Sequence, residues 1–331
     1  MKKRIYESEE VQGQSQGEKK PAPGNEGLSQ IIGLPYQQFV MKLKGLASDS
    51  KVQAVINAGK TDGKQEDEAF QFQEIDFDVK TLRPLQNEID MDNSLKFPLS
   101  GASKQLEDML RGTPVQILGP VVVYNYSGQD YIVDGHHRWS QVYAINKDGK
   151  IKGIRLTAKS KVDPRRILKA TQMAIAAIMK EVPTASAKGV NLLTISEDAL
   201  KDYIKSGKGS LGDKPFQGLQ ENVVKRFQSV KSDLSSVDAI SNFIWQNVVS
   251  MKQTSGELWK KLNIKRDYMP QTDLGASGNE KDPKTKETVK KMVSGTINFL
   301  SPSEKDIVEK GKEVNEEKLI KSFERFIQSR R

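Results

Sequence analysis

The hydrophobic period of this chain changes once, and that change limits the folds it can adopt. Up to about residue 160 the apolar residues follow strand patterns, such as the alternation of Ile75, Phe77 and Val79 with acidic neighbours. From Asp163-Pro164, a strong helix start, the period is helical to the end of the chain. The pattern predicts an α+β protein with a small mixed-sheet domain followed by a mostly α-helical domain.

Within the first part, turn signals separate the expected elements. Arg83-Pro84 should end the first strand, and a helix is expected over Ser103–Arg111. Val121–Tyr124 and Tyr131–Val133 flank Ser127-Gly128 and predict a hairpin. A helix containing Trp139 and Tyr143 should end at Lys147-Asp148-Gly149, and a last strand is expected over Ile154–Thr157.

Composition divides the chain into four regions. Residues 1–27 have almost no apolar residues, so we expect a disordered tail, and residues 28–69 should form short helices and a linker. Residues 70–160 make the mixed-sheet domain, and residues 163–331 make the helical domain, with a flexible joint near 275–285. The helices expected in that last region are Ile167–Met179, Leu219–Val230, Val237–Met251, Lys286–Phe299 and Glu317–Gln328.

Composition also narrows the function. The 331 residues include no cysteine, which excludes disulfides, thiolate metal sites and cysteine nucleophiles. The net charge of +9 favours polyanions such as nucleotides or DNA, although the basic residues are interleaved with acids. No apolar run is long enough to span a membrane, and the N-terminal residues do not form a secretory signal, so we expect a cytoplasmic protein with no membrane partner.

Both histidines of the chain lie side by side in the block Asp134-Gly135-His136-His137-Arg138-Trp139. The block joins a predicted strand to a predicted helix, where backbone N–H groups of the first helical turn can bind an anion. Gly135 lets a phosphate approach the backbone, and Arg138 can hold phosphate oxygens with two hydrogen bonds. His136 and His137 would add two donors whose charge responds to pH. The block therefore predicts a phosphate-binding turn.

Three roles are open for Asp134: it can cap the helix, orient an imidazole or hold a magnesium ion. A helix cap is the most common fate of an aspartate at such a place, and Trp139 is more often a core residue than a stacking platform. Adjacent histidines point about 100° apart on a helix, which argues against a zinc site.

The order of motifs resembles the ParB/sulfiredoxin-like superfamily. The resemblance rests on Pro84-Leu85-Gln86 after a strand, Gly119-Pro120-Val121-Val122-Val123, and Tyr131-Ile132-Val133 leading into the histidine block. It covers roughly residues 70–160, and it implies a nucleotide-binding or phosphate-binding domain, of a kind often described as a nuclease in bacteriophage proteins. The ligand it implies is CTP, ATP or ADP, with magnesium.

The chain departs from each branch of that superfamily at one position or more. Sulfiredoxins carry a cysteine where His136 stands, so their redox chemistry is excluded. Chromosome-partitioning ParB proteins have a Gly-Glu-Arg-Arg block, which Gly135 and Arg138 match while the two histidines do not. Free-serine kinases of this fold share the Asp-Gly-His-His-Arg-Trp block, but their catalytic glutamate corresponds to Gln86, and Glu88 is a substitute two residues on.

We therefore expect nucleotide or phosphate binding through residues 134–138 and Gln86, possible DNA association, and a magnesium ion at Asp134. Two alternatives remain open. One is an enzyme, a phosphotransferase or a nuclease, with His136, His137 and Glu88 as catalytic residues. A metal-dependent nuclease normally needs several carboxylates, and the candidates are Asp134 with Glu88 or Asp90. The other is a non-catalytic virion or interaction protein.

Overall fold

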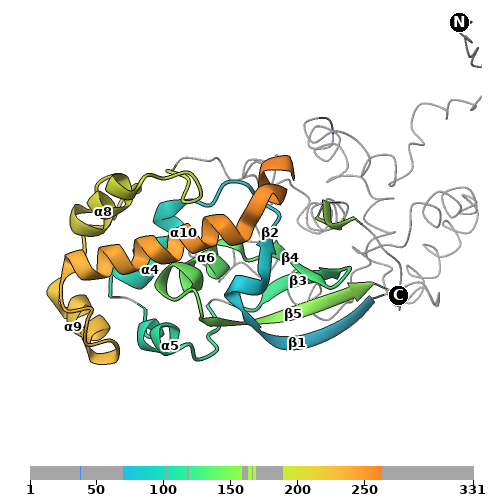
Figure 1. Ribbon diagram of the computed structural model, residues 1–331, viewed down its shortest axis with the longest axis horizontal. Coiled ribbons are helices and arrows are strands. Elements are labelled where there is room, and N and C mark those ends of the chain that lie inside the picture. Colours follow the sequence, from blue (N-terminus) through green and yellow to red (C-terminus); the bar gives the residue numbers. More distant parts are fainter. Residues whose placement is uncertain are drawn as a thin grey trace, which may run out of the picture.

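The computed structural model describes residues 70–158 apart from 102 and 118, residues 163–168 apart from 166, residues 189–262, and Gln38. A mixed sheet lies beside a group of helices, and the long helix α10 crosses the helical side (Figure 1). The strands are β1 (Phe70–Asp78), β2 (Leu82–Pro84), β3 (Val121–Tyr126), β4 (Gln129–Asp134) and β5 (Lys150–Ala158). The helices are η3 (Val79–Thr81), α4 (Met91–Leu99), α5 (Leu106–Arg111), α6 (His136–Ile145), α8 (Glu197–Ser206), α9 (Glu221–Val230) and α10 (Val237–Leu262).

The five strands stand in the order β1-β5-β3-β4-β2. Strands β1 and β5 are antiparallel, as are β3 and β4, whereas β3 pairs with β5 and β2 pairs with β4 in parallel. The predicted hairpin of β3 and β4 is confirmed, with Ser127 and Gly128 at its turn in the left-handed region. A mixed sheet followed by helices is the α+β architecture that the change of period predicts.

Three elements differ from the sequence prediction. Arg83-Pro84 does not end the strand pairing: Leu82–Pro84 form the short edge strand β2, where a proline is tolerated because one side needs no ladder bond. Helix α4, which contains Pro98, was not predicted; Asp90 caps it by accepting from the Asn93 N–H. Helix α8 was also missed, although its cap at Ser196 follows the usual rule.

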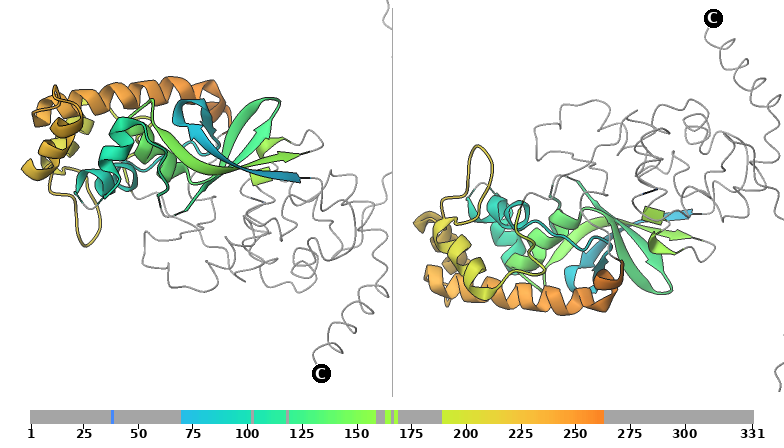
Figure 2. Two further views of the ribbon diagram at one scale, coloured as in Figure 1. Left: turned by 90° about the horizontal axis from the view of Figure 1, so that it is seen from below. Right: turned by 90° about the horizontal axis from the view of Figure 1, so that it is seen from above.

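One hydrophobic core joins the sheet to the helices. On one face of the sheet, Val121, Val123 and Ile132 pack in the same cluster as Trp139 and Val142 of α6. The cluster continues through residues of α8, α9 and α10 without a break. Figure 2 shows α10 running along the side of this helical layer. The helices of the C-terminal half therefore belong to the same core as the sheet that carries the histidine block.

Predictions for residues 1–69, for Lys286–Phe299 and for Glu317–Gln328 lie outside the described residues, apart from Gln38. The start of the helix predicted after Asp163 is described: Asp163 Oδ1 accepts from the Arg165 N–H, and Pro164 begins a helical segment. Helices α9 and α10 confirm two further predictions, with α10 running on to Leu262. Among the described helices, none combines the length and the apolar character needed to cross a membrane.

Candidate functional site

The turn between β4 and α6 is built around Gly135. This glycine is the N-cap of α6 and has a φ of 98°, in the left-handed region, and no side chain caps the helix. Asp134 is the last residue of β4, so the interpretation of Asp134 as the N-cap is wrong. A Cβ on Gly135 would lie 2.8 Å from Val121 Cγ1 and 3.1 Å from Nε of Arg138. Both the backbone angle and the close contacts therefore require glycine here.

The guanidinium of Arg138 lies directly against Gly135. It donates from Nη1 to the Pro120 carbonyl at 2.8 Å and from Nη2 to the Asp134 carboxylate. The two residues are four apart, and the side chains of Arg138 and Asp134 are 12% and 20% exposed. Arg138 thus fastens the end of β4 to the segment before β3 while it stands at the N-terminus of α6.

His136 is buried and acts as a hydrogen-bond acceptor. Its Nε2 accepts from the backbone N–H groups of Leu85 at 3.1 Å and Gln86 at 3.3 Å. Burial lowers the pKa of His136 to about 4, with the Arg138 charge acting in the same direction and Asp134 opposing it. The neutral ring therefore carries its proton on Nδ1. At Nε2, His136 is an acceptor and not the phosphate donor that the sequence predicts.

His137 also accepts a backbone N–H through Nε2, from a residue later in the same segment. Its Nε2 accepts from the Asp90 N–H at 3.2 Å, at the start of α4. The next turn adds a buried contact between the hydroxyls of Ser140 and Ser94, 2.7 Å apart. The two histidines together hold residues 85–90 against the first turn of α6, so the two motifs behind the family resemblance meet although fifty residues separate them.

Gln86 and Glu88 lie in this held segment. The Gln86 side chain is buried and donates to the backbone carbonyl of Glu88, so it is used within its own loop. Glu88 is partly buried. The structure therefore brings Gln86 against His136 through its backbone N–H rather than its side chain, and Glu88 lies in the same loop.

Residues 189–193, which we call the strap, cover the same segment from the other side. Asn191 Oδ1 accepts from the Ile89 N–H, and its Nδ2 donates to the Asn87 carbonyl. A Cβ on Gly189 would lie 1.9 Å from the Asp90 carboxylate, so a larger residue there would displace the side chain that caps α4. The strap leads into α8, and it ties the candidate site to the C-terminal helices.

The residues do not fit a magnesium ion held by protein alone. The Asp134 carboxylate is paired with Arg138, and the described part of the chain has no group of three His, Cys, Asp or Glu able to hold a metal. Magnesium that enters with a nucleotide is held largely by the phosphates and water, and Asp134 would be its one candidate protein ligand here.

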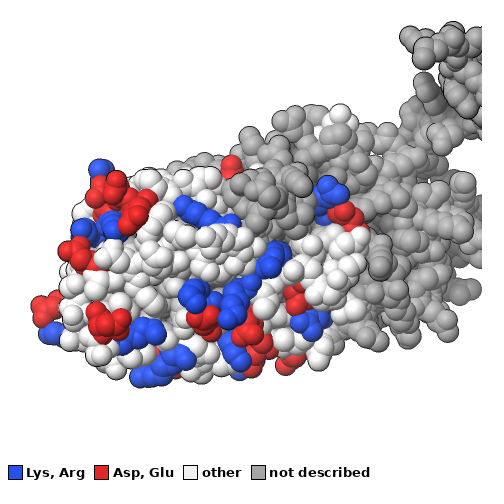
Figure 3. All heavy atoms as spheres, in the orientation of Figure 1, with Lys and Arg blue, Asp and Glu red and all other residues white. Residues whose placement is uncertain are grey.

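The face of the described residues drawn in Figure 3 has no broad basic patch. Acidic and basic side chains are nearly equal in number among these residues, and they alternate over the face in Figure 3. Most of the +9 charge therefore belongs to residues outside the described part.

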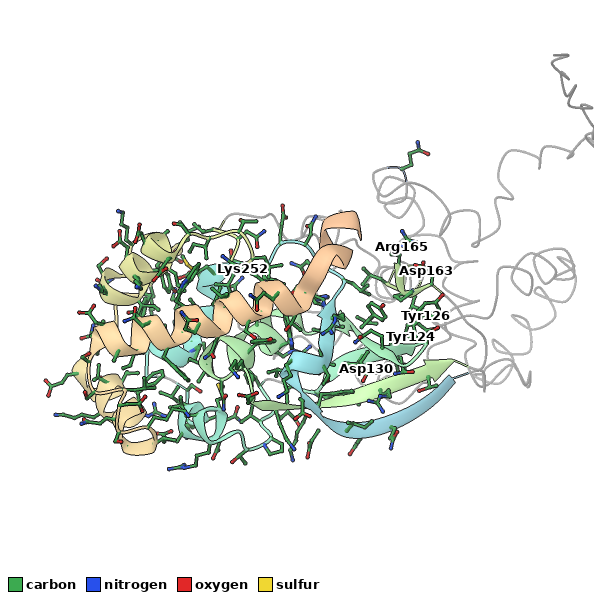
Figure 4. The ribbon with its side chains drawn as sticks, viewed as in Figure 1. Tyr124, Tyr126, Asp130, Asp163, Arg165 and Lys252 are labelled. Carbon is green, nitrogen blue, oxygen red and sulfur yellow. The ribbon has the colours of Figure 1, made fainter. Side chains whose placement is uncertain are left out.

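A second arginine–aspartate pair lies toward the hairpin end of β4. Arg155 donates to both carboxylate oxygens of Asp130, at 3.1 and 2.7 Å, and Asn125 adds a third bond at 2.7 Å. Figure 4 places Asp130 near Tyr124 and Tyr126, while Lys252 lies apart on α10. Sequence reasoning did not single out this pair, since its partners meet only when three strands pair.

No protein-family model matches the chain, and a search of curated proteins finds no match. The site therefore has to be interpreted from its own geometry.

Sequence reasoning also missed Asn191 as a member of the site, and it did not foresee the contacts of Pro120 with Arg138 or of Asp90 with His137. The cap signal of Asp90 before Asn93 could have been found from local spacing. Asn191 lies more than a hundred residues from the loop it holds, and no local pattern points to it.

Proposed function

We propose that the chain binds a nucleotide, with its phosphates at the first turn of α6. One observation carries the proposal: α6 begins at a left-handed glycine, without a side-chain cap, and the Arg138 guanidinium lies against that glycine. First-turn N–H groups have no partner within a helix, and the helix dipole favours an anion there. A phosphate would be held by these groups and by Arg138, in competition with Asp134.

The histidine geometry supports binding rather than turnover. Both Nε2 atoms already accept backbone N–H groups, and His136 is neutral near pH 7 because its pKa is about 4. A ring in that state is a poor general acid at Nε2. We infer that the histidines hold residues 85–90 in place, so that the nucleotide meets a preformed surface.

DNA association is the second part of the proposal, and it rests on the net charge of the whole chain. Because the charges of the described residues nearly balance, DNA contacts would be made by segments outside them. The resemblance to ParB-like domains and a bacteriophage setting remain parts of this proposal.

Calorimetric titration of the full chain with CTP, ATP and ADP, with and without magnesium, tests nucleotide binding. We expect at least one nucleotide to bind, and Arg138→Ala to weaken it by about tenfold or more, since a charge-assisted bond is lost. Arg111→Ala is the matched control, because Arg111 is an exposed arginine at the end of α5. It should bind as the unchanged chain does.

Two results would overturn the proposal. One is the absence of heat or saturable binding for all three nucleotides under both conditions. The other is Arg138→Ala binding as tightly as Arg111→Ala while both variants stay folded.

A further inference from the structure

Gln141 carries a buried acceptor without a donor. It lies on α6, it is 7% exposed, and its Nε2 donates to the Asn93 carbonyl at 3.0 Å. Its Oε1 is buried and, within the described part of the chain, meets no hydrogen-bond donor. Buried polar atoms are nearly always paired, so an exception of this kind calls for a physical reason.

The contacts of Gln141 place it beside the candidate phosphate site. It follows His137 by four residues, which puts both side chains on one face of α6, about 6 Å apart along the axis. Helical side chains lean toward the N-terminus, so the Gln141 amide lies over the turn that holds His137.

Both side chains also contact the same turn of α4. His137 accepts from the Asp90 N–H, Asp90 Oδ1 accepts from the Asn93 N–H, and Asn93 accepts from Gln141. Asn93 itself is exposed, so this turn of α4 reaches the surface next to the amide. The Gln141 amide therefore lies on the side of α6 that faces α4, one helical turn from His137 in the first turn of the helix.

We propose that Gln141 determines which ligand the site accepts, by taking a hydrogen bond from an N–H or O–H group of the ligand through Oε1. The inference rests on the proposed nucleotide binding and narrows it. The ligand is a nucleoside phosphate that carries a donor, either a ribose hydroxyl or a base amino group, about one helical turn from its phosphates. Phosphate groups alone do not use Gln141.

The test uses the full chain with Gln141→Met, which keeps the length of the side chain and removes the acceptor. We expect CTP or ATP, whichever binds, to lose about fivefold to tenfold in affinity, since one neutral hydrogen bond is lost. Pyrophosphate, which has no such donor, should bind both proteins equally. Gln228→Met, at an exposed position on α9, is the control and should change neither affinity.

Nucleotide analogues then identify the donor. The 2′-deoxy forms remove a ribose hydroxyl, and UTP and ITP replace the base amino group by a carbonyl. The analogue that binds the unchanged chain more weakly and is indifferent to Gln141→Met lacks the group that Gln141 recognises.

A second measurement separates recognition from a structural role. Without ligand, Gln141→Met loses the Nε2 bond to the Asn93 carbonyl as well as the unpaired acceptor, and because these two effects oppose one another the melting temperature should change little. The inference is overturned if nucleotide and pyrophosphate weaken equally, or if nucleotide affinity is unchanged, in which case Oε1 is satisfied by water. If neither pyrophosphate nor any nucleotide binds the unchanged chain, the proposed function fails together with the inference.

Discussion

The two ends of β4 each hold an arginine–aspartate pair near a left-handed glycine. The pairs differ in the partners that the guanidinium group binds. At the hairpin end, Arg155 gives two bonds to Asp130 and lies over the Phe77 ring, 5.3 Å from its centre. At the α6 end, Arg138 divides its bonds between Asp134 and the Pro120 carbonyl beside an uncapped helix.

The difference indicates which pair is structural and which can serve a ligand. A bidentate pair on a buried carboxylate satisfies both partners, and it stabilises the pairing of β3, β4 and β5. A guanidinium beside a helix N-terminus that no side chain caps adds positive potential where an anion can approach. Similar residue pairs on one strand therefore have different roles, and the variants below test the distinction.

The largest effect is expected from Arg155→Leu. Among the described residues it leaves the buried Asp130 carboxylate with Asn125 as its one side-chain donor, and breaking a largely buried pair costs about 3 kcal/mol. Urea unfolding measures the loss. Arg165→Leu is the control, since Arg165 makes a similar pair with Asp163 while its side chain is 55% exposed, and it should cost less than about 1 kcal/mol. Equal losses for the two variants would mean that Asp130 is not a buried anchor.

The next effect is a pH dependence from His136. The unfolded imidazole, with a pKa of 6.5, binds a proton that the folded protein does not bind until about pH 4. The contribution of His136 to the free energy of unfolding should therefore be complete above pH 6.5, and the free energy should fall by about 3 kcal/mol as the pH drops to 4. His136→Gln, which keeps an acceptor but does not titrate, should remove this part of the pH dependence. If the stability of the unchanged protein has the same pH profile as that of His136→Gln, His136 is not the group that titrates.

The smallest effect compares the two glycines. Gly128 has a φ of 81° and nothing within 4 Å of an added Cβ, so Gly128→Ala should cost about 1 kcal/mol from the backbone alone. Gly135→Ala adds the contacts with Val121 and Arg138 and should cost about 1 kcal/mol more. Thermal unfolding gives both values. Only Gly135→Ala should also weaken nucleotide binding, and the same loss of affinity from Gly128→Ala would remove the distinction between the ends of β4.

Local signals in the sequence were sufficient for some elements of this fold. The hairpin around Ser127-Gly128 and the strand–glycine–helix order of the block follow from short-range patterns, and both are confirmed. Helix α4 has conflicting local signals, because Asp90 is a good N-cap while Pro98 disfavours a helix interior, and Leu95 and Leu99 of this helix pack in the core.

The site was predictable in place but not in role. The sequence points to residues 134–138 because both histidines lie there, yet the role of each ring depends on partners fifty residues away, at Leu85 and Asp90. The strap could not be foreseen at all, since the Asn191 contacts with residues 87–89 arise only when the chain is folded.

The chain contains only two imidazoles, and their protonation states decide whether the histidine block can hold residues 85–90. A long-range proton–nitrogen spectrum of the ¹⁵N-labelled protein, recorded from pH 7.5 to 4, shows for each ring which nitrogen carries the proton. We predict two rings protonated on Nδ1, with Nε2 as the acceptor, and a His136 signal that does not shift until about pH 4. A His136 ring protonated on Nε2, or one that titrates near pH 6.5, would contradict the claim that the histidine block holds residues 85–90 against α6.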